Sequence, residues 1–585
     1  MSKQQIEQCL KTAIQELQQS GDLPADIPRF QIDATKDQQH GDFATNIALM
    51  LSKPLKRKPK DIAAMIMKAL PHSKNIKKVE IAGPGFINFF LTNDTFYNVV
   101  TESLVKGENY GRSHIGNKKR IIVEFVSSNP TGPLHVGHGR HGAYGAVIAN
   151  LLETIGYDVY REYYVNDAGR QMDIVAVSVW LRYLNLCGEN GIFPSNGYQG
   201  EYIISIARKL LEQEGKRLVV PARILFETLP LDAPDGDKEI YIDALIARAK
   251  KLLGDANYDC VFDRALDDIL ADISEDLAEF GVTFDHWFSE RAFTRTDNVN
   301  HMIKTLQQKG FTYEKDGALW FRSTDFHDEK DRVLERANGV RTYFANDLAY
   351  HANKFKRGFD LAINIFGSDH HGYVPRIQAG LQALGVDTSK WLHLFMQFVT
   401  LYRNGEQAQM STRSGSFVTL RELRDEVGKD AARFFYVMRK CEQHMDFDLD
   451  LAKSESNENP VYYVQYAHAR ILSVFRQLAE KKMTYDQVAG LAHLSLLTEE
   501  HELQLLRTLT RYQEVVLMAA EQYEPHLLTH YLREVANDFH AYYNAHSFLV
   551  ENNELRCARL SLIAATRQIL LNGLKLLGVS APESM

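Results

Sequence analysis

The chain has 585 residues, about four times the usual length of one domain, so three or four domains are expected. Hydrophobic residues make up 45% of it and charged residues 24%, which is ordinary for a globular protein and argues against a collagen-like or low-complexity chain. The formal net charge of −8 excludes a global positive field for nucleic acid, although one basic face would suffice for binding. The sequence has no apolar run of about 18 residues or more, which predicts no membrane span.

The cysteines indicate the compartment. They are scattered along the chain, so no pair has the spacing of a CxxC metal or redox site: Cys9, Cys187, Cys260, Cys441 and Cys557. An odd, scattered set is typical of reduced thiols, and the N-terminus lacks the apolar core of a signal peptide. These features predict a cytoplasmic protein.

Residues 1–110 are predicted to form a small α+β domain. Helical periodicity runs through residues 1–20 and again from Ala44 to Leu51. Residues 79–91 contain two apolar runs around a Gly-Pro-Gly turn, which predicts a hairpin. Between them lies the basic segment Lys53–Lys60, which has two interpretations: a solvated connection between helices, or a contact for nucleic-acid phosphates.

Residues 118–400 follow the pattern of a doubly wound (Rossmann-type) parallel α/β domain. A short apolar strand at 121–126 ends in a Ser-Ser-Asn-Pro-Thr-Gly-Pro loop. A helix is predicted from about Leu134 to a terminating glycine at 156, and a second strand at 157–165. This strand–helix–strand order predicts a ligand at the carboxyl ends of the strands.

The rest of the chain is mostly helical in pattern. A helical, acidic insertion is predicted at about 170–275, and further strands are expected at three places: 311–322, 342–344 and 361–366. Residues 401–455 are expected to connect to a helical bundle at 456–585. Apolar residues in the bundle recur at spacings of three and four, as in Val464, Ala467, Ile471, Val474 and Leu478.

The most informative segment is Leu-His-Val-Gly-His-Gly-Arg at 134–140, between the first predicted strand and its helix. His135 and His138 are three residues apart, so both can face one ligand from the first helical turn. Gly137 lets the backbone approach a ligand, and a helix N-terminus offers unpaired N–H groups and a positive dipole end. We expect this segment to stabilise charge on a reacting phosphate group.

A metal site is the alternative interpretation of these histidines. A zinc ion would need a third ligand, for which His141, His370 and His371 are candidates. No Cys or Glu joins them at zinc spacing, and no metal ligands are predicted.

The motif at 135–138 resembles the HIGH signature of class I aminoacyl-tRNA synthetases, and its context, Val123–Gly132, resembles arginyl-tRNA synthetases. The resemblance extends over essentially the whole chain, at His40–Asn46, Gly83–Phe86, Arg161–Gly169, Tyr198–Tyr202, Tyr343–His351, Gly367–Tyr373, Asp446–Asp450, Glu458–Arg470 and Ala581–Met585. It implies that ATP activates L-arginine to an adenylate, with tRNA bound, and that arginine then passes to the terminal ribose of tRNA(Arg). It also implies Mg²⁺ accompanying ATP, no permanent cofactor, and a monomer.

The resemblance also assigns residues to ligands. ATP would contact His135, Gly137, His138, Gly367, Asp369 and Gln397. Arginine would be held by Asn129 at its α-amino and carboxylate end, by Glu290 and Asp347 at the guanidinium, and by Tyr343, which closes the pocket. A guanidinium has five donors in a plane, so carboxylates suit it. Without the resemblance, Asp347 could simply cap a helix and Glu290 could be a solvated surface residue.

Two domains would contact tRNA. The N-terminal domain resembles the family's additional tRNA-contacting domain, and the bundle resembles its anticodon-binding domain. The assigned contacts are Lys56, Arg57, Lys58, Tyr466 and Met585. Other bundle tyrosines could also stack on bases, although most aromatic stripes are core: Tyr462, Tyr463, Tyr542 and Tyr543.

The second class I signature departs from its pattern. Where the family has K-M-S-K-S or K-M-S-K-R, residues 409–413 read Gln-Met-Ser-Thr-Arg, so both lysines are missing. Met410, Ser411 and Arg413 are expected to act on the ATP phosphates together with His135 and His138. Candidates to replace the missing charge are Lys118, Lys119 and Arg140.

Two other functions remain open at this point. The altered signature would suit a catalytically weakened paralogue that binds tRNA or arginine. The H-x-G-H motif also serves small-substrate nucleotidylyltransferases, although the C-terminal bundle and the Asn-Pro-Thr-Gly context argue against that class.

Overall fold

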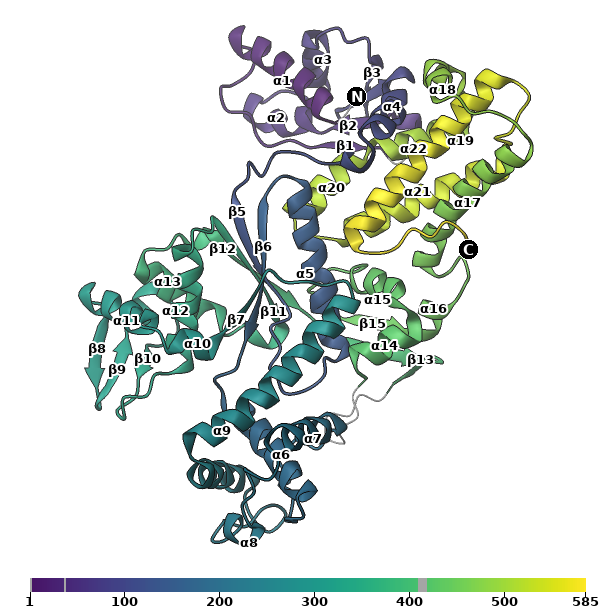
Figure 1. The fold of residues 1–585 in the computed structure, drawn as a ribbon. Helices are drawn as coiled ribbons and strands as arrows, with labels where there is room; N and C mark the ends of the chain where they lie inside the picture. The colour runs from purple at the N-terminus through teal and green to yellow at the C-terminus, as the bar shows by residue number, and fades with distance from the viewer. Residues whose placement is uncertain (1–2, 36–37, 409–417) are drawn as a thin grey trace.

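The computed structural model describes residues 3–35, 38–408 and 418–585 (Figure 1). A parallel sheet lies at the centre of the molecule, helices extend from it on several sides, and the N-terminal domain packs beside the C-terminal bundle. That last contact joins opposite ends of the chain: the Tyr97 hydroxyl donates to the Leu497 carbonyl at 3.1 Å, and Arg507 pairs with Asp42 at 3.1 Å.

The N-terminal domain is an antiparallel sheet covered by helices. Its elements are α1 (Lys3–Gln19), β1 (Ile32–Ala34), β2 (Phe43–Thr45), α2 (Ile47–Leu55), α3 (Pro59–Ala69), β3 (Ile76–Ala82), β4 (Phe86–Leu91) and α4 (Asp94–Lys106), with strand order β1-β2-β4-β3. The predicted hairpin is confirmed as β3 and β4. The predicted start of the second helix at Ala44 is wrong, because Ala44 lies in β2 and pairs with Asp33 and Asn88.

The central sheet is parallel, with the order β12-β11-β5-β6-β7. Its strands are β5 (Arg120–Glu124), β6 (Asp158–Val165), β7 (His286–Ser289), β11 (Leu361–Gly367) and β12 (Trp391–Met396). α5 (Val136–Thr154) connects β5 to β6, and Gly156 follows it at φ 98°, as its pattern predicted. The chain begins in the middle of the sheet and winds outward in both directions. This confirms the doubly wound fold and places its switch point between β5 and β11.

The helical insertion between β6 and β7 is also confirmed. It consists of α6 (Arg170–Leu186), α7 (Glu201–Glu214), α8 (Ala222–Leu225) and α9 (Lys238–Glu279), and Gly254 interrupts the last helix with φ 69°.

One predicted strand is a helix. Residues 342–344 begin α12 (Tyr343–Lys356), because the Thr342 hydroxyl caps the helix by accepting from the Ala345 N–H. The β signal at 311–322 forms a separate antiparallel sheet with β10, outside the parallel one. The elements of this part are α10 (Glu290–Thr294), α11 (Asn298–Gln308), β8 (Thr312–Lys315), β9 (Ala318–Phe321), β10 (Arg332–Glu335) and α13 (Val374–Leu384).

The C-terminal part is helical, as predicted, after a small sheet. Its elements are β13 (Val399–Arg403), β14 (Glu406–Gln407), α14 (Leu420–Val427), α15 (Lys429–Tyr436), β15 (Met445–Asp448), α16 (Leu449–Lys453), α17 (Pro460–Glu480), α18 (Gln487–Ala492), α19 (Glu500–Thr510), α20 (Tyr512–Glu521), α21 (His526–Ala545) and α22 (Asn553–Leu577). The apolar stripe of α17 is buried. Among the described residues α22 alone is long and apolar enough to cross a membrane, but 67% of its apolar window is buried, as in a core helix.

Candidate active site

The predicted site residues converge at one edge of the central sheet. The loop after β5 carries Asn129 and His135, β7 runs into Glu290, and β12 runs into Gln397. β11 ends at Gly367, which pairs with Met396 of β12. The carboxyl ends of parallel strands meet at the same edge, so distant parts of the chain reach one region.

The two signature histidines hold each other in place at the start of α5. His135 is the N-cap residue, and its Nδ1 accepts from the Gly137 N–H at 3.0 Å and the His138 N–H at 3.4 Å. In return, the His135 N–H donates to Nδ1 of His138 at 3.3 Å. The rings stack with their centroids 3.6 Å apart. Because each Nδ1 accepts a hydrogen bond, the proton of each neutral ring lies on Nε2, which makes Nε2 a donor.

These histidines are neutral donors and not cations. Burial lowers the pKa of both, and for His138 the charges of His135 and His141 lower the pKa further. The expectation of unpaired N–H groups at this helix start is wrong. Gly137 and His138 donate to His135 Nδ1, and the Val136 N–H donates to the Val418 carbonyl at 3.3 Å. The helix dipole still favours a phosphate at this end of α5.

Gly137 is required by the histidine pair. A Cβ at this position would lie 2.9 Å from Cε1 of His135, so any side chain would push the ring out of its stacked position.

The second signature falls outside the described residues, and with it Met410, Ser411 and Arg413. The chain that follows it is placed beside the first signature. Thr419 forms an antiparallel bridge with His135, and the Leu420 N–H donates to the Leu134 carbonyl at 2.8 Å. Residues 419 and 420, which follow the second signature in the chain, are therefore neighbours of the first signature in the fold.

The candidates for replacing the missing lysines are wrong. Arg140 is fully buried and donates to three main-chain carbonyls, those of Gln397, Lys440 and Gln443, at 2.8–3.0 Å. Lys118 and Lys119 precede β5 and therefore lie at the amino end of the sheet, away from the site. Arg140 has a structural role instead, since it fixes the main chain at Gln397.

Gly367, the last residue of β11, and Asp369, two residues later, form a compact turn. Asp369 folds back over Gly367, where a Cβ would lie 2.5 Å from its carboxylate oxygen. Burial and the neighbouring Arg140 lower the pKa of His141 to about 4, and the charge of Asp369 acts in the opposite direction. The structure thus places Gly367 and Asp369 near the first turn of α5.

Glu290 and Asp347 are two acidic residues whose pKa values are raised; Glu290 is buried, and Asp347 of α12 is partly exposed. Glu290 is 4% exposed at the start of α10, and burial raises its pKa. Burial raises the pKa of Asp347 to about 7; the charges of Glu290 and Glu124 also raise it, while a hydrogen bond from Tyr373 lowers it. Glu290 is therefore no solvated surface residue, and Asp347 is no cap. A carboxyl whose charge is disfavoured by burial and by a neighbouring carboxyl is suited to binding a cation.

Asn129 and Tyr343 lie beside a pocket of about 200 Å³. The Asn129 side chain donates to Gln171 at 2.9 Å and accepts from Asn166 at 3.0 Å, which orients its amide. Tyr343 is 62% exposed at the rim. The other lining residues are Asn166, Gly169, Arg170 and Gln171.

Tyr202 supports this loop, a role that the sequence does not indicate. It belongs to α7 of the insertion, and its hydroxyl donates to the Thr131 carbonyl at 2.6 Å. A Cβ at Gly132 would lie 2.8 Å from that hydroxyl, so the glycine makes room for it. The only sequence signal was the Tyr-Gln-Gly-Glu-Tyr match at 198–202, because the contact joins residues far apart in the chain.

Comparisons with known proteins identify the family. The model of the arginyl tRNA synthetase N-terminal domain matches residues 4–91, and that of the class I (R) tRNA synthetase catalytic domain matches 99–185 and 238–453. The DALR anticodon binding domain matches 464–585. Proteins named arginine–tRNA ligase from Thioalkalivibrio sulfidiphilus and Legionella pneumophila (strain Corby) are 59% and 56% identical to the chain, with 100% and 99% of both sequences covered.

The chain belongs to the arginyl-tRNA synthetase family. The Thermus thermophilus arginyl-tRNA synthetase structure is 23% identical and covers both chains completely, with a TM-score of 0.75, which supports the fold. The matched catalytic segments leave out residues 186–237, the part of the insertion that contains α7 and Tyr202.

Proposed function

We propose that the pocket between the loop after β5, the start of α10 and α12 binds the L-arginine that this arginine–tRNA ligase activates with ATP and transfers to tRNA(Arg). The observation that carries the assignment is the proximity of Asp347, which is partly exposed, to the buried Glu290, whose charge raises the pKa of Asp347. A guanidinium is permanently charged and planar, so it can satisfy both carboxylates with its five donors. The compact ammonium of lysine would leave part of this acceptor set unpaired.

The histidine pair acts at the other end of the substrate. A carboxylate oxygen of arginine attacks the α-phosphorus of ATP, and pyrophosphate leaves. In the second step a ribose hydroxyl of the tRNA attacks the arginyl carbonyl, and AMP leaves. Nε2–H of His135 and His138 would donate to phosphate oxygens as charge develops on them, without proton transfer.

Mg²⁺ would enter this site with ATP. Within residues 3–35, 38–408 and 418–585 no group of three or more His, Cys, Asp or Glu side chains could hold a metal ion. The triphosphate would therefore supply its ligands, as is usual for Mg²⁺ with nucleotides.

A charging assay tests this function directly. Incubation with ATP, radiolabelled arginine and tRNA should give arginyl-tRNA, and omission of any one substrate should abolish it. Failure to charge at any tRNA concentration would contradict the proposal and favour a protein that only binds tRNA or arginine. Adenylylation of a small substrate without tRNA transfer would favour the nucleotidylyltransferase alternative.

Arginine affinity is expected to rise with pH up to about 7 and then level off, because the pKa of Asp347 in the empty pocket is raised to about 7. Below that pH the guanidinium must displace a proton, so the apparent Kd should fall by up to about tenfold for each pH unit gained. Calorimetry in two buffers of different ionisation enthalpy should show about one proton released per arginine bound in this range. Binding that does not change between about pH 5 and pH 8 would contradict the assignment.

The proposed tRNA surface of the N-terminal domain combines charge with an exposed ring. Lys56, Arg57 and Lys58 are exposed between α2 and α3. The turn of the β3–β4 hairpin packs against this segment, since a Cβ at Gly85 would lie 2.6 Å from Pro59. Phe86, next to that turn, is 38% exposed. Basic side chains beside an exposed ring suit a phosphate backbone and a splayed base.

In the C-terminal bundle, fewer of the candidate tRNA contacts are accessible to a ligand. Tyr466 is half-buried, stacks on Tyr462 with centroids 5.9 Å apart and lies under the Arg470 guanidinium. Met585 is 48% exposed. Tyr542 is fully buried and donates to Glu502, so the hypothesis that it stacks on RNA is wrong. We propose Tyr466 and Met585 as contacts of the anticodon arm.

Replacing Lys56, Arg57 and Lys58 together with alanine is expected to raise the KM for tRNA and leave the KM for arginine unchanged, because the change removes only cations that face phosphates. The slope of log affinity against log salt should become shallower by about one for each phosphate that is no longer neutralised. Filter binding over a salt series measures it. The variant Lys304→Ala, on the outer helix α11, is the control, and an equal effect there would contradict the assigned surface.

A further inference from the structure

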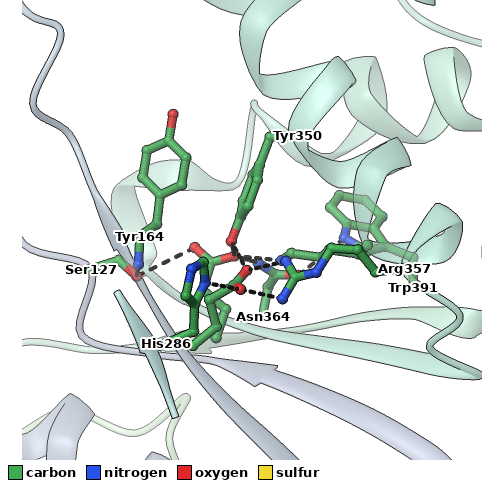
Figure 2. A network of polar contacts seen from close by, with 10 residues as sticks. Ser127, Tyr164, His286, Tyr350, Arg357, Asn364 and Trp391 are labelled. Carbon is green, nitrogen blue, oxygen red and sulfur yellow. Dashed lines mark hydrogen bonds and ion pairs between the residues drawn. The ribbon is translucent and has the colours of Figure 1, made fainter. Parts of the chain in front are cut away.

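A row of polar residues crosses the central sheet at a single register (Figure 2). Asn364 of β11 pairs with Glu124 of β5, which pairs with Glu162 of β6, which pairs with His286 of β7. Asn364 and Glu162 are fully buried and Glu124 is nearly so. Strands of parallel sheets are usually continuous apolar runs, so a buried acidic row needs an explanation.

Helix α12 covers this row with partners for each acid. Lys354 contacts the carboxylate of Glu124 and donates to the Asn364 amide oxygen at 3.2 Å. Arg357 binds Glu162 through both terminal nitrogens, at 3.1 and 2.6 Å. Figure 2 shows Tyr350, Arg357, Asn364 and His286 converging between the helix and the sheet.

The Tyr350 hydroxyl bridges the two acids. It lies 2.8 Å from Glu124 Oε2 and 2.9 Å from Glu162 Oε1. Two acids and two cations make this set electrically balanced. Removing any one member would leave a buried charge or acceptor without its partner, which fixes the helix at one position on the sheet.

The same face of α12 carries the arginine-binding groups. Asp347 lies one turn before Tyr350, and Tyr343 lies two turns before it. The last member of the row, His286, leads to the other side of the pocket, because the chain continues from His286 along β7 to Glu290. The row therefore joins the helix that carries one pocket carboxyl to the strands that lead to the other.

We propose that the network of Tyr350, Lys354 and Arg357 with Glu124 and Glu162 is a positioning device for arginine, which fixes α12 so that Asp347 stays close to Glu290. Tyr350 and Lys354 of α12 and Arg357, which follows the helix, act through Asp347 and do not touch the substrate. The inference rests on the arginine pocket proposed above.

Tyr350→Phe tests it, because the ring keeps its packing on Tyr164 and Phe288 and only the bridging hydroxyl is removed. The KM for arginine should rise about tenfold, the equivalent of one hydrogen bond of about 1.4 kcal/mol. The kcat and the KM values for ATP and tRNA should stay within about twofold of the wild type.

The C-terminal bundle offers a matched control. There the buried Tyr542 hydroxyl donates to Glu502 at 3.0 Å, and Arg559 pairs with the same oxygen at 2.8 Å. Tyr542→Phe removes the same chemistry far from the pocket. It should lower the melting temperature about as much as Tyr350→Phe does and leave the KM for arginine unchanged. Equal KM effects of the two changes would mean a purely structural role and overturn the inference.

A second pair of variants keeps the inference testable if Tyr350→Phe fails to fold. Arg357 follows α12 and is partly exposed, and Glu162 keeps His286 and the charge of Lys354 when Arg357 is replaced, so this change should cost less stability than removal of another member of the network. Arg357→Ala should raise the KM for arginine, and Arg357→Lys, which keeps the charge, should restore part of the affinity. An unchanged KM in these variants, with Asp347→Asn still defective, would overturn the positioning role and leave the pocket standing. An unchanged KM in Asp347→Asn as well would overturn the pocket itself.

Discussion

Replacing Asp347 with asparagine is expected to lower kcat/KM for arginine by about 10²- to 10⁴-fold, because the guanidinium then has only Glu290 as a charged partner. Removing one member of a buried charge pair costs about 3–5 kcal/mol, and each 1.36 kcal/mol corresponds to about a tenfold change in rate. Steady-state charging at varied arginine and saturating ATP and tRNA measures the effect.

The stability of the Asp347→Asn variant distinguishes a lost contact to arginine from unfolding of the protein. The pKa of Asp347 is raised to about 7 in the folded protein, so between about pH 4 and pH 7 the unfolded chain loses the Asp347 proton first. The ligand-free wild type therefore loses stability as the pH rises through this range. Asparagine has no such charge, so the variant should be at least as stable as the wild type at pH 8. Asp316→Asn, in the left-handed turn between β8 and β9, is the control and should leave kcat/KM unchanged. If Asp347→Asn were so unstable that the unfolded fraction alone accounted for the lower kcat/KM, the assigned role would be contradicted.

Replacing His138 with alanine is expected to lower kcat for charging by about 10²- to 10³-fold, the usual effect of losing one donor to a developing charge. The affinity for tRNA should stay nearly unchanged, because His138 lies in the first turn of α5 and contacts His135. Single-turnover charging and filter binding measure the two quantities separately.

Conservative variants identify the atom that acts. The Nδ1 atom of His138 is occupied by the His135 N–H, which leaves Nε2–H for the phosphate. A glutamine amide can place a donor near the position of Nε2, whereas the shorter asparagine amide reaches only the position of Nδ1. His138→Gln should therefore retain more activity than His138→Asn. His301→Ala, on α11, is the control. Equal losses of charging and tRNA binding in His138→Ala would be incompatible with a role at the phosphates.

The features that could be predicted were those encoded by neighbouring residues. The period of the apolar residues and a terminating Gly156 located α5, and the Gly-Pro-Gly turn located the β3–β4 hairpin. The errors in predicted secondary structure arose where one residue type is common in both helices and strands. Thr342 has a high strand propensity but also caps helices, and the capping role prevailed. Ala44 suits a helix, yet pairing with β1 and β4 placed it in a strand.

By itself, the sequence determined the family, the doubly wound fold and the position of the histidine pair at the start of α5, because each of these follows from a short motif in a local context. Only the tertiary structure decided that Glu290 and Asp347 lie together, that His135 and His138 are uncharged, and that Arg140 serves the main chain and not a phosphate. It also decided that Tyr350 and Lys354 lock the helix on which Asp347 lies. The reason is that pKa values and hydrogen-bond partners depend on burial and on contacts between segments far apart in the chain, and periodicity and spacing carry no information about either.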